Sequence, residues 1–142
     1  MIEERVWLSS YPEGVPADID ASQYDSLVGL MEESFSKFAS RTAYSYMGRD
    51  ISYQETDVKS QALAAYFQSL GLEKGDRIAI MMPNVPQYPV AVAAILRAGL
   101  VLVNINPLYT PRELEHQLKD SGAKLIFSIG PSSTRTACSA SV

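Results

Sequence analysis

Two hydrophobic patterns alternate along residues 77–129 of the chain. Nearly continuous apolar runs, typical of strands buried on both faces, occupy residues 77–82 (RIAIMM), 100–103 (LVLV) and 124–129 (KLIFSI). Apolar residues at helical spacing fill the two intervals, over residues 86–98 and 110–121. This order of strand, helix, strand, helix, strand predicts right-handed crossovers and a parallel sheet. The predicted fold class is therefore α/β, a partial doubly wound parallel sheet with flanking helices.

A helix and a short hairpin are predicted ahead of this layer. Ser26 is a good N-cap residue, and a helix-spaced apolar face follows it at Leu27, Leu30, Met31, Phe35 and Phe38. Residues 43–52 (AYSYMGRDIS) then predict a hairpin whose tip is formed by residues 48–50 (GRD).

A second helix is predicted from Ser52 onward. Ser52 and Glu55 match a capping box, in which each side chain bonds the backbone N–H of the other residue. Gly71 stands where a C-terminal cap residue belongs. We expect the helix to bury one apolar face, formed by Val58, Ala62, Leu63, Tyr66 and Leu70.

The two ends of the chain lack this periodicity. Residues 1–25 are rich in proline and turn-forming residues and are predicted to form an extended N-terminal arm, anchored by Trp7, Leu8 and Tyr11. Six of the last twelve residues (PSSTRTACSASV) are Ser or Thr, so we expect residues 130–142 to form a disordered tail. The abrupt loss of pattern suggests a truncated or shifted reading frame there. A natural flexible C-terminus is the alternative.

Composition and charge narrow the function classes. The chain has 142 residues, about one domain, with 12 Lys or Arg against 16 Asp or Glu, which gives a net charge of −4. Its cations are scattered singly, so we expect no nucleic-acid partner. The single cysteine, Cys138, has no partner for an internal disulfide. The N-terminus does not resemble a secretory signal, and we expect no membrane span.

The sequence offers three candidate functional features, each with a plainer interpretation. Glu113 and His116 could form an acid–base pair, but a surface helix pair at this spacing is the favoured interpretation. Cys138 could be a reactive thiol, although a plain exposed thiol is favoured. Residues 104–110 (NINPLYT) follow a strand end where ligands bind in α/β sheets, yet a structural connector is favoured two to one. No glycine-rich phosphate loop, metal-ligand motif or nucleophile elbow is found in the sequence.

Most of the chain resembles the N-terminus of bacterial long-chain fatty-acid–CoA ligases, which belong to the adenylate-forming, AMP-binding superfamily. The stretch NPLYTPRELEHQLKDSG, residues 106–122, points specifically to the long-chain group. The matching stretches are residues 7–16 (WLSSYPEGVP), 24–34 (YDSLVGLMEES), 71–92 (GLEKGDRIAIMMPNVPQYPVAV) and 95–124 (ILRAGLVLVNINPLYTPRELEHQLKDSGAK).

This resemblance implies a ligase of fatty-acid metabolism that uses ATP, Mg²⁺ and CoA. In such enzymes the fatty carboxylate attacks the α-phosphate of ATP to give acyl-AMP and pyrophosphate, and the CoA thiol then displaces AMP. The family's ATP-binding and catalytic motifs come after the matched region. No catalytic, cofactor-binding or metal-binding residue is therefore transferred to this chain.

The resemblance also implies how the chain is organised and where it works. Residues 26–129 would be an incomplete N-terminal subdomain, which we expect to be inactive alone and to self-associate. The family works in the cytoplasm, with peripheral contact at the inner membrane. A stand-alone binding or interaction module is the alternative, because an open sheet invites partners. A small flavodoxin-like ligand-binding protein is a third, less favoured hypothesis.

Overall fold

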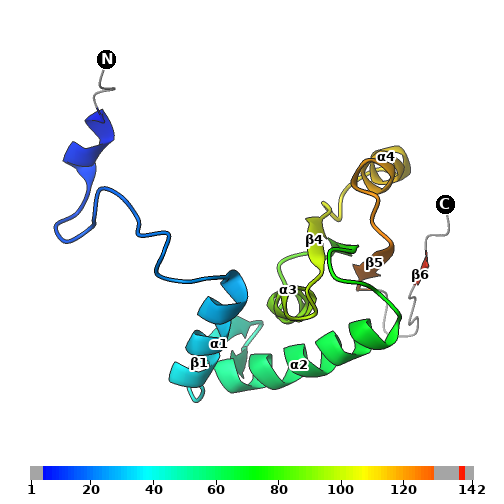
Figure 1. Cartoon of the computed structure of the whole chain (residues 1–142), viewed down its shortest axis with the longest axis horizontal. Helices are drawn as coiled ribbons and strands as arrows, with labels where there is room; N and C mark the ends of the chain where they lie inside the picture. The colour runs from blue at the N-terminus through cyan, green and yellow to red at the C-terminus, as the bar shows by residue number, and fades with distance from the viewer. Residues whose placement is uncertain (1–4, 130–137, 140–142) are drawn as a thin grey trace.

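The computed structural model describes residues 5–129 and 138–139 (Figure 1). The described chain begins with a short 3₁₀ helix, a first helix and a hairpin, and three further helices and four strands follow. In chain order the elements are η1 (Val6–Ser10), α1 (Leu27–Lys37), β1 (Thr42–Tyr46), β2 (Arg49–Ser52), α2 (Tyr53–Ser69), β3 (Arg77–Met81), α3 (Gln87–Arg97), β4 (Val101–Asn104), α4 (Pro111–Ser121), β5 (Leu125–Ser128) and β6 (Cys138–Ser139).

The main sheet has the strand order β4-β3-β5-β6. The central strand β3 runs parallel to both β4 and β5, with Ile78 opposite Leu102 on one side and Leu125 on the other. All of its middle residues, Ile78, Ala79 and Ile80, are fully buried. The predicted parallel sheet and its doubly buried strand are therefore confirmed.

Helices cover both faces of this sheet. Ile78 and Ile80 pack with Phe67 of α2 and Ile95 of α3, whereas the intervening Ala79 packs toward α4 on the opposite face. Figure 1 accordingly shows α2 and α3 on one side of the strands and α4 on the other. This alternation is the doubly wound layer that the sequence predicts.

The first helix and the hairpin lie beside the N-terminal half of α2 (Figure 1). Ser26 caps α1 as expected, because its Oγ accepts a hydrogen bond from the Gly29 N–H at 3.1 Å. The hairpin tip differs from the prediction. Met47 and Gly48 form a two-residue turn with φ of 48° and 78°, so residues 49–50 lie in β2 instead.

The buried face of α2 was wrongly predicted. Val58 and Tyr66 are exposed, whereas the fully buried positions include two polar residues, Thr56 and Ser60, together with Phe67. The hydroxyls of Thr56 and Ser60 hydrogen-bond to backbone oxygens of their own helix, which lets them be buried at little cost. A pattern that counts only apolar residues therefore selects the wrong face.

The rest of the predicted buried face and the predicted capping box of α2 also differ from the structure. Ala62 and Leu70 are exposed, and Leu63 is only half-buried. Ser52 does cap α2 by accepting from the Glu55 N–H at 3.0 Å. The Glu55 carboxylate, however, pairs with Lys59 rather than with the Ser52 backbone, so only half of the predicted capping box forms.

The remaining differences lie at the edges of the fold. The predicted buried strand at residues 100–103 is the edge strand β4, with Val101 45% exposed. The N-terminal arm is not wholly extended, because it contains η1, and its expected anchors Trp7 and Tyr11 are exposed. Residues 138–139 form the short strand β6, which pairs antiparallel with β5. The rest of the predicted tail lies outside the described residues.

Candidate functional site

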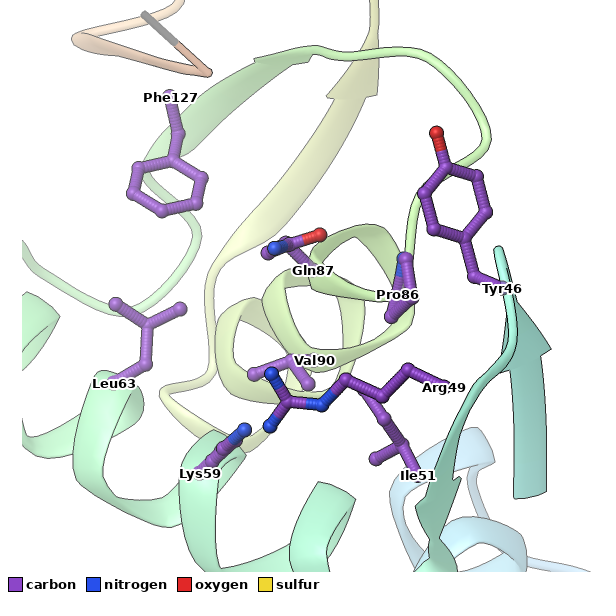
Figure 2. Close-up of a pocket in the computed structure, with 9 residues that line it drawn as sticks. All are labelled: Tyr46, Arg49, Ile51, Lys59, Leu63, Pro86, Gln87, Val90 and Phe127. Atoms are coloured by element: carbon purple, nitrogen blue, oxygen red, sulfur yellow. The ribbon is translucent and has the colours of Figure 1, made fainter. Parts of the chain in front are cut away.

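A cavity of about 260 Å³ opens between the hairpin, α2, α3 and β5 (Figure 2). Its walls are mainly apolar and include Leu63 of α2, Val90 of α3 and Phe127 of β5. Phe127 is held in place by an edge-to-face contact with the fully buried Phe67, at 5.9 Å between ring centroids. The cavity thus has a fixed floor that belongs to the main hydrophobic core.

Two cationic side chains line the same cavity. Arg49 reaches across its lower side from β2 toward Lys59 of α2 in Figure 2. Both cations approach a single carboxylate, with Glu55 Oε1 at 2.5 Å from Lys59 Nζ and at 3.6 Å from Arg49 Nη2. The hydrogen bond from Lys59 lowers the pKa of Glu55, and Arg49 adds to this effect. At neutral pH the two cations, Arg49 and Lys59, and the Glu55 carboxylate therefore have a combined net charge of +1.

Sequence reasoning missed this cluster. Arg49 was assigned to a hairpin tip, and the helical spacing that joins Lys59 to Glu55 is that of an ordinary surface ion pair. The distance in sequence between β2, α2, α3 and β5 hides their convergence. To place Arg49 and Lys59 together, the sequence would have to show which face α2 turns toward the hairpin. That face is predicted wrongly.

A second polar cluster centres on Arg97 at the end of α3. Its guanidinium donates to the backbone oxygen of Asp57 at 3.1 Å and to Ser60 Oγ at 2.6 Å, and it also pairs with the Asp57 carboxylate. Glu32 of α1 lies 3.5 Å from its Nε, and the Phe35 ring stacks beneath it at 5.0 Å. The contacts of Arg97 reach residues of α1 and α2, so this cluster joins α1, α2 and α3.

The loop at residues 104–110 acts as a connector in the structure. The Asn104 side chain accepts from the Tyr88 hydroxyl at 2.8 Å, and its backbone oxygen accepts from Gln117 Nε2 at 2.9 Å. Asn106 Oδ1 accepts from the Leu108 N–H at 3.0 Å, which closes an Asx turn. These contacts use the polar groups of the loop to position α4, as the favoured interpretation expects.

The proposed acid–base pair is not formed. Glu113 accepts from both the backbone N–H and the hydroxyl of Thr110, at 2.8 and 2.7 Å, within a complete capping box. The backbone hydrogen bond from Thr110 lowers the pKa of Glu113. His116 is exposed on α4. Cys138 lies in β6, and its side chain is outside the described part of the structure.

The opposite end of the sheet is closed by an ion pair. Lys124 Nζ lies 2.7 Å from Asp76 Oδ1, and Asp76 Oδ2 accepts from the Glu73 N–H at 2.9 Å. The Lys124 hydrogen bond, followed by that from Glu73, holds the pKa of Asp76 below its ordinary value. This pair fixes the start of β5 beside the start of β3.

Among the residues that the structure describes, no three His, Cys, Asp or Glu side chains converge in a way that could hold a metal ion. Over the same residues, none of the helices combines the length and the apolar character that crossing a bilayer requires.

Comparison with known proteins assigns the chain to a family. The model of the family described as AMP-binding enzyme matches residues 31–141. The chain belongs to this family. The match includes residues 130–141, for which a foreign reading frame stays a prediction.

Relatives within the AMP-binding family are long-chain-fatty-acid–CoA ligases. The chain is 53% identical over 124 residues to that of Escherichia coli O157:H7 and 54% identical over 125 residues to that of Salmonella typhimurium. It is 35% identical over 129 residues to the ligase of Bacillus subtilis. These alignments cover 87–91% of this chain but only 22–23% of the relatives. The chain thus spans about a fifth of their length.

Solved structures of adenylation enzymes share the fold. Klebsiella oxytoca NpsA in complex with 3-hydroxyanthranilyl-AMSN matches with a TM-score of 0.72 at 28% identity, over 81% of this chain and 24% of that one. The NpsA N-terminal subdomain with the same compound matches with a TM-score of 0.70 over 72% of this chain and 26% of that one. The fold of this AMP-binding family member therefore matches part of an adenylation N-terminal subdomain.

Proposed function

We propose that the chain is the N-terminal part of a long-chain fatty-acid–CoA ligase. The complete enzyme would join a fatty acid to CoA through an acyl-adenylate, with release of AMP and pyrophosphate. The observation that carries this proposal is the 53% identity to a curated ligase, sustained over 124 residues.

Within such an enzyme, this chain would act as scaffold. Polar groups of Arg97, Asp76 and residues 104–110 each make contacts inside the fold. We infer that ATP, Mg²⁺ and CoA are bound by later parts of the complete ligase, and we assign no catalytic, cofactor-binding or metal-binding residue to this chain. On its own, we expect it to be inactive.

The same proposal covers location and assembly. A ligase of this kind would work in the cytoplasm and contact the membrane peripherally, where fatty acids are available. The isolated chain would self-associate, because β4 is an edge strand of the described sheet and carries the half-exposed Val101. Leu108, 86% exposed in the loop that follows β4, would add further exposed apolar surface.

A chimera tests the ligase assignment directly. Residues 7–127 would replace the aligned segment of the Escherichia coli O157:H7 ligase, and acyl-CoA formation from palmitate, ATP, Mg²⁺ and CoA would be measured. Because the two sequences are 53% identical over 124 residues, we expect activity within about tenfold of the parent enzyme. The 142-residue chain alone should form no thioester.

The control is the same graft carrying Ile80→Asp. This change buries an unpaired carboxylate in the central strand and should abolish soluble, active enzyme. A chimera that folds but does not turn over would contradict the ligase assignment and favour the stand-alone binding module. Thioester formation by the chain alone would show that the proposed role of this chain as an inactive scaffold is wrong.

A further inference from the structure

We propose that the cavity between the hairpin, α2, α3 and β5 binds a small organic anion with an apolar body, such as an aryl-alkyl carboxylate. This proposal does not depend on the ligase reaction. It rests on the side chains that line the cavity in Figure 2 and on the charge of the group at its mouth.

The cavity has the size and the walls of a site for a small ligand. Its volume of about 260 Å³ is slightly below the range of about 300–1,000 Å³ that holds drug-sized molecules. Leu63, Val90 and Phe127 supply an apolar floor on three different elements. Removing an aromatic or short aliphatic body from water against this floor would provide most of the favourable free energy.

The charge at the mouth selects an anion. Lys59 and Arg49 line the cavity together, and the only carboxylate that the structure pairs with Arg49 is Glu55, which also pairs with Lys59. Arg49 lies at 3.6 Å from Glu55, which is beyond ordinary hydrogen-bond length. Its planar donors are therefore available to a ligand carboxylate, to which guanidinium binds in a bidentate manner.

The N-terminus of α3 adds to this selection. Pro86 and Gln87 line the cavity at the first turn of the helix, whose N-cap makes no side-chain hydrogen bond. The first turn of α3 contains no acidic residue that would oppose the positive end of the helix dipole. The positive end of the α3 dipole thus favours a negatively charged ligand, as Arg49 and Lys59 do.

The experiment uses the full chain with 4-phenylbutyrate as the probe and 4-phenylbutanol as its neutral counterpart. Backbone amide shifts would be followed by ¹H–¹⁵N NMR as each compound is titrated. We expect saturable shifts in the low-millimolar range, centred on residues around Lys59, Val90 and Phe127, for the carboxylate. The alcohol should bind about tenfold more weakly, because it carries no negative charge and cannot accept a bidentate pair of hydrogen bonds from a guanidinium.

Matched variants separate the site from the surface. Lys59→Ala should weaken 4-phenylbutyrate binding about three- to tenfold. Lys119→Ala removes an equivalent helical pair with Glu115 at 2.6 Å on α4 and should leave binding unchanged. Val90→Phe should fill the cavity and abolish binding, whereas Val58→Phe on the exposed face of α2 should not.

Several results would overturn the proposal. Equal affinity for the acid and the alcohol would leave only an apolar crevice, without selection for an anion. Equal loss of affinity in Lys59→Ala and Lys119→Ala would indicate nonspecific electrostatic attraction. Shifts that lie away from the cavity, or no saturable shifts for the unmodified chain, would show that the cavity does not bind this class of ligand.

Discussion

Arg97 is the side chain on which three helices converge. Only 10% of it is exposed, and its partners come from α1 and α2 while it belongs to α3. An arginine is suited to this position because its planar fork can serve Asp57 and Ser60 at once while its face lies on Phe35. Lysine has neither the fork nor the flat face.

Replacing Arg97 by methionine should destabilise the chain by about 2–3 kcal/mol, because Asp57 would keep its charge in a largely buried place without its partner. The free energy of unfolding would be measured by urea denaturation. Arg112→Met, at an exposed position of α4, should change it by less than about 0.5 kcal/mol. Equal effects of the two substitutions would contradict the assigned role of Arg97.

At the scale of the element, α2 shows that burial does not follow hydrophobicity alone. Phe67 is fully buried against β3 and Phe127, while its neighbour Tyr66 points outward. Thr56 and Ser60 complete the buried face with hydroxyls that bond to the helix backbone. Two of the four buried residues of α2 are therefore polar.

This orientation predicts a sharp contrast between two adjacent aromatic residues. Phe67→Ala should cost about 3–5 kcal/mol of unfolding free energy, because it leaves a cavity in the main core. Tyr66→Ala should cost less than about 1 kcal/mol. Chemical denaturation of both variants would measure the difference. Had the face predicted from sequence been correct, the order of the two effects would be reversed.

The regular elements of the sheet could be predicted from the sequence because their signals are local. The β3 run is apolar without interruption, and Thr110 with Pro111 and Glu113 marks the start of α4 by caps that act within one turn. The parallel pairing then followed from connection rules, whereas the strand order comes from the structure.

The cavity and the Arg97 cluster could not be predicted in this way. Arg97 meets Asp57 across 40 positions of the chain, and no spacing rule connects them. The cavity joins four elements whose faces are set by tertiary packing. The predicted face of α2 contains Leu63 but not Lys59, so it does not bring Lys59 to the cavity beside Val90. Long-range sites of this kind depend on the orientation of each helix. In α2 that orientation includes buried polar residues, Thr56 and Ser60, whose hydroxyls are hydrogen-bonded to the backbone.

At the scale of the whole molecule, the described sheet ends at an open strand. Sedimentation velocity of the isolated chain should show association that increases with concentration, since β4 exposes Val101 and its unpaired edge. Val101→Lys should shift the chain toward monomer by placing a charge on that edge. Val58→Lys, a matched change on α2, should not. A monomer at all concentrations would contradict this proposal.

The central place of β3 also bears on the order in which the chain can fold. β3 is made first, and both of its partners arrive later, each after a crossover helix. During synthesis, therefore, the most apolar strand waits without neighbours until β4 and then β5 have been completed. Parallel pairing of this kind depends on contacts distant in sequence and is slow to form. The nascent chain should accordingly be most vulnerable to aggregation between the emergence of β3 and that of β4.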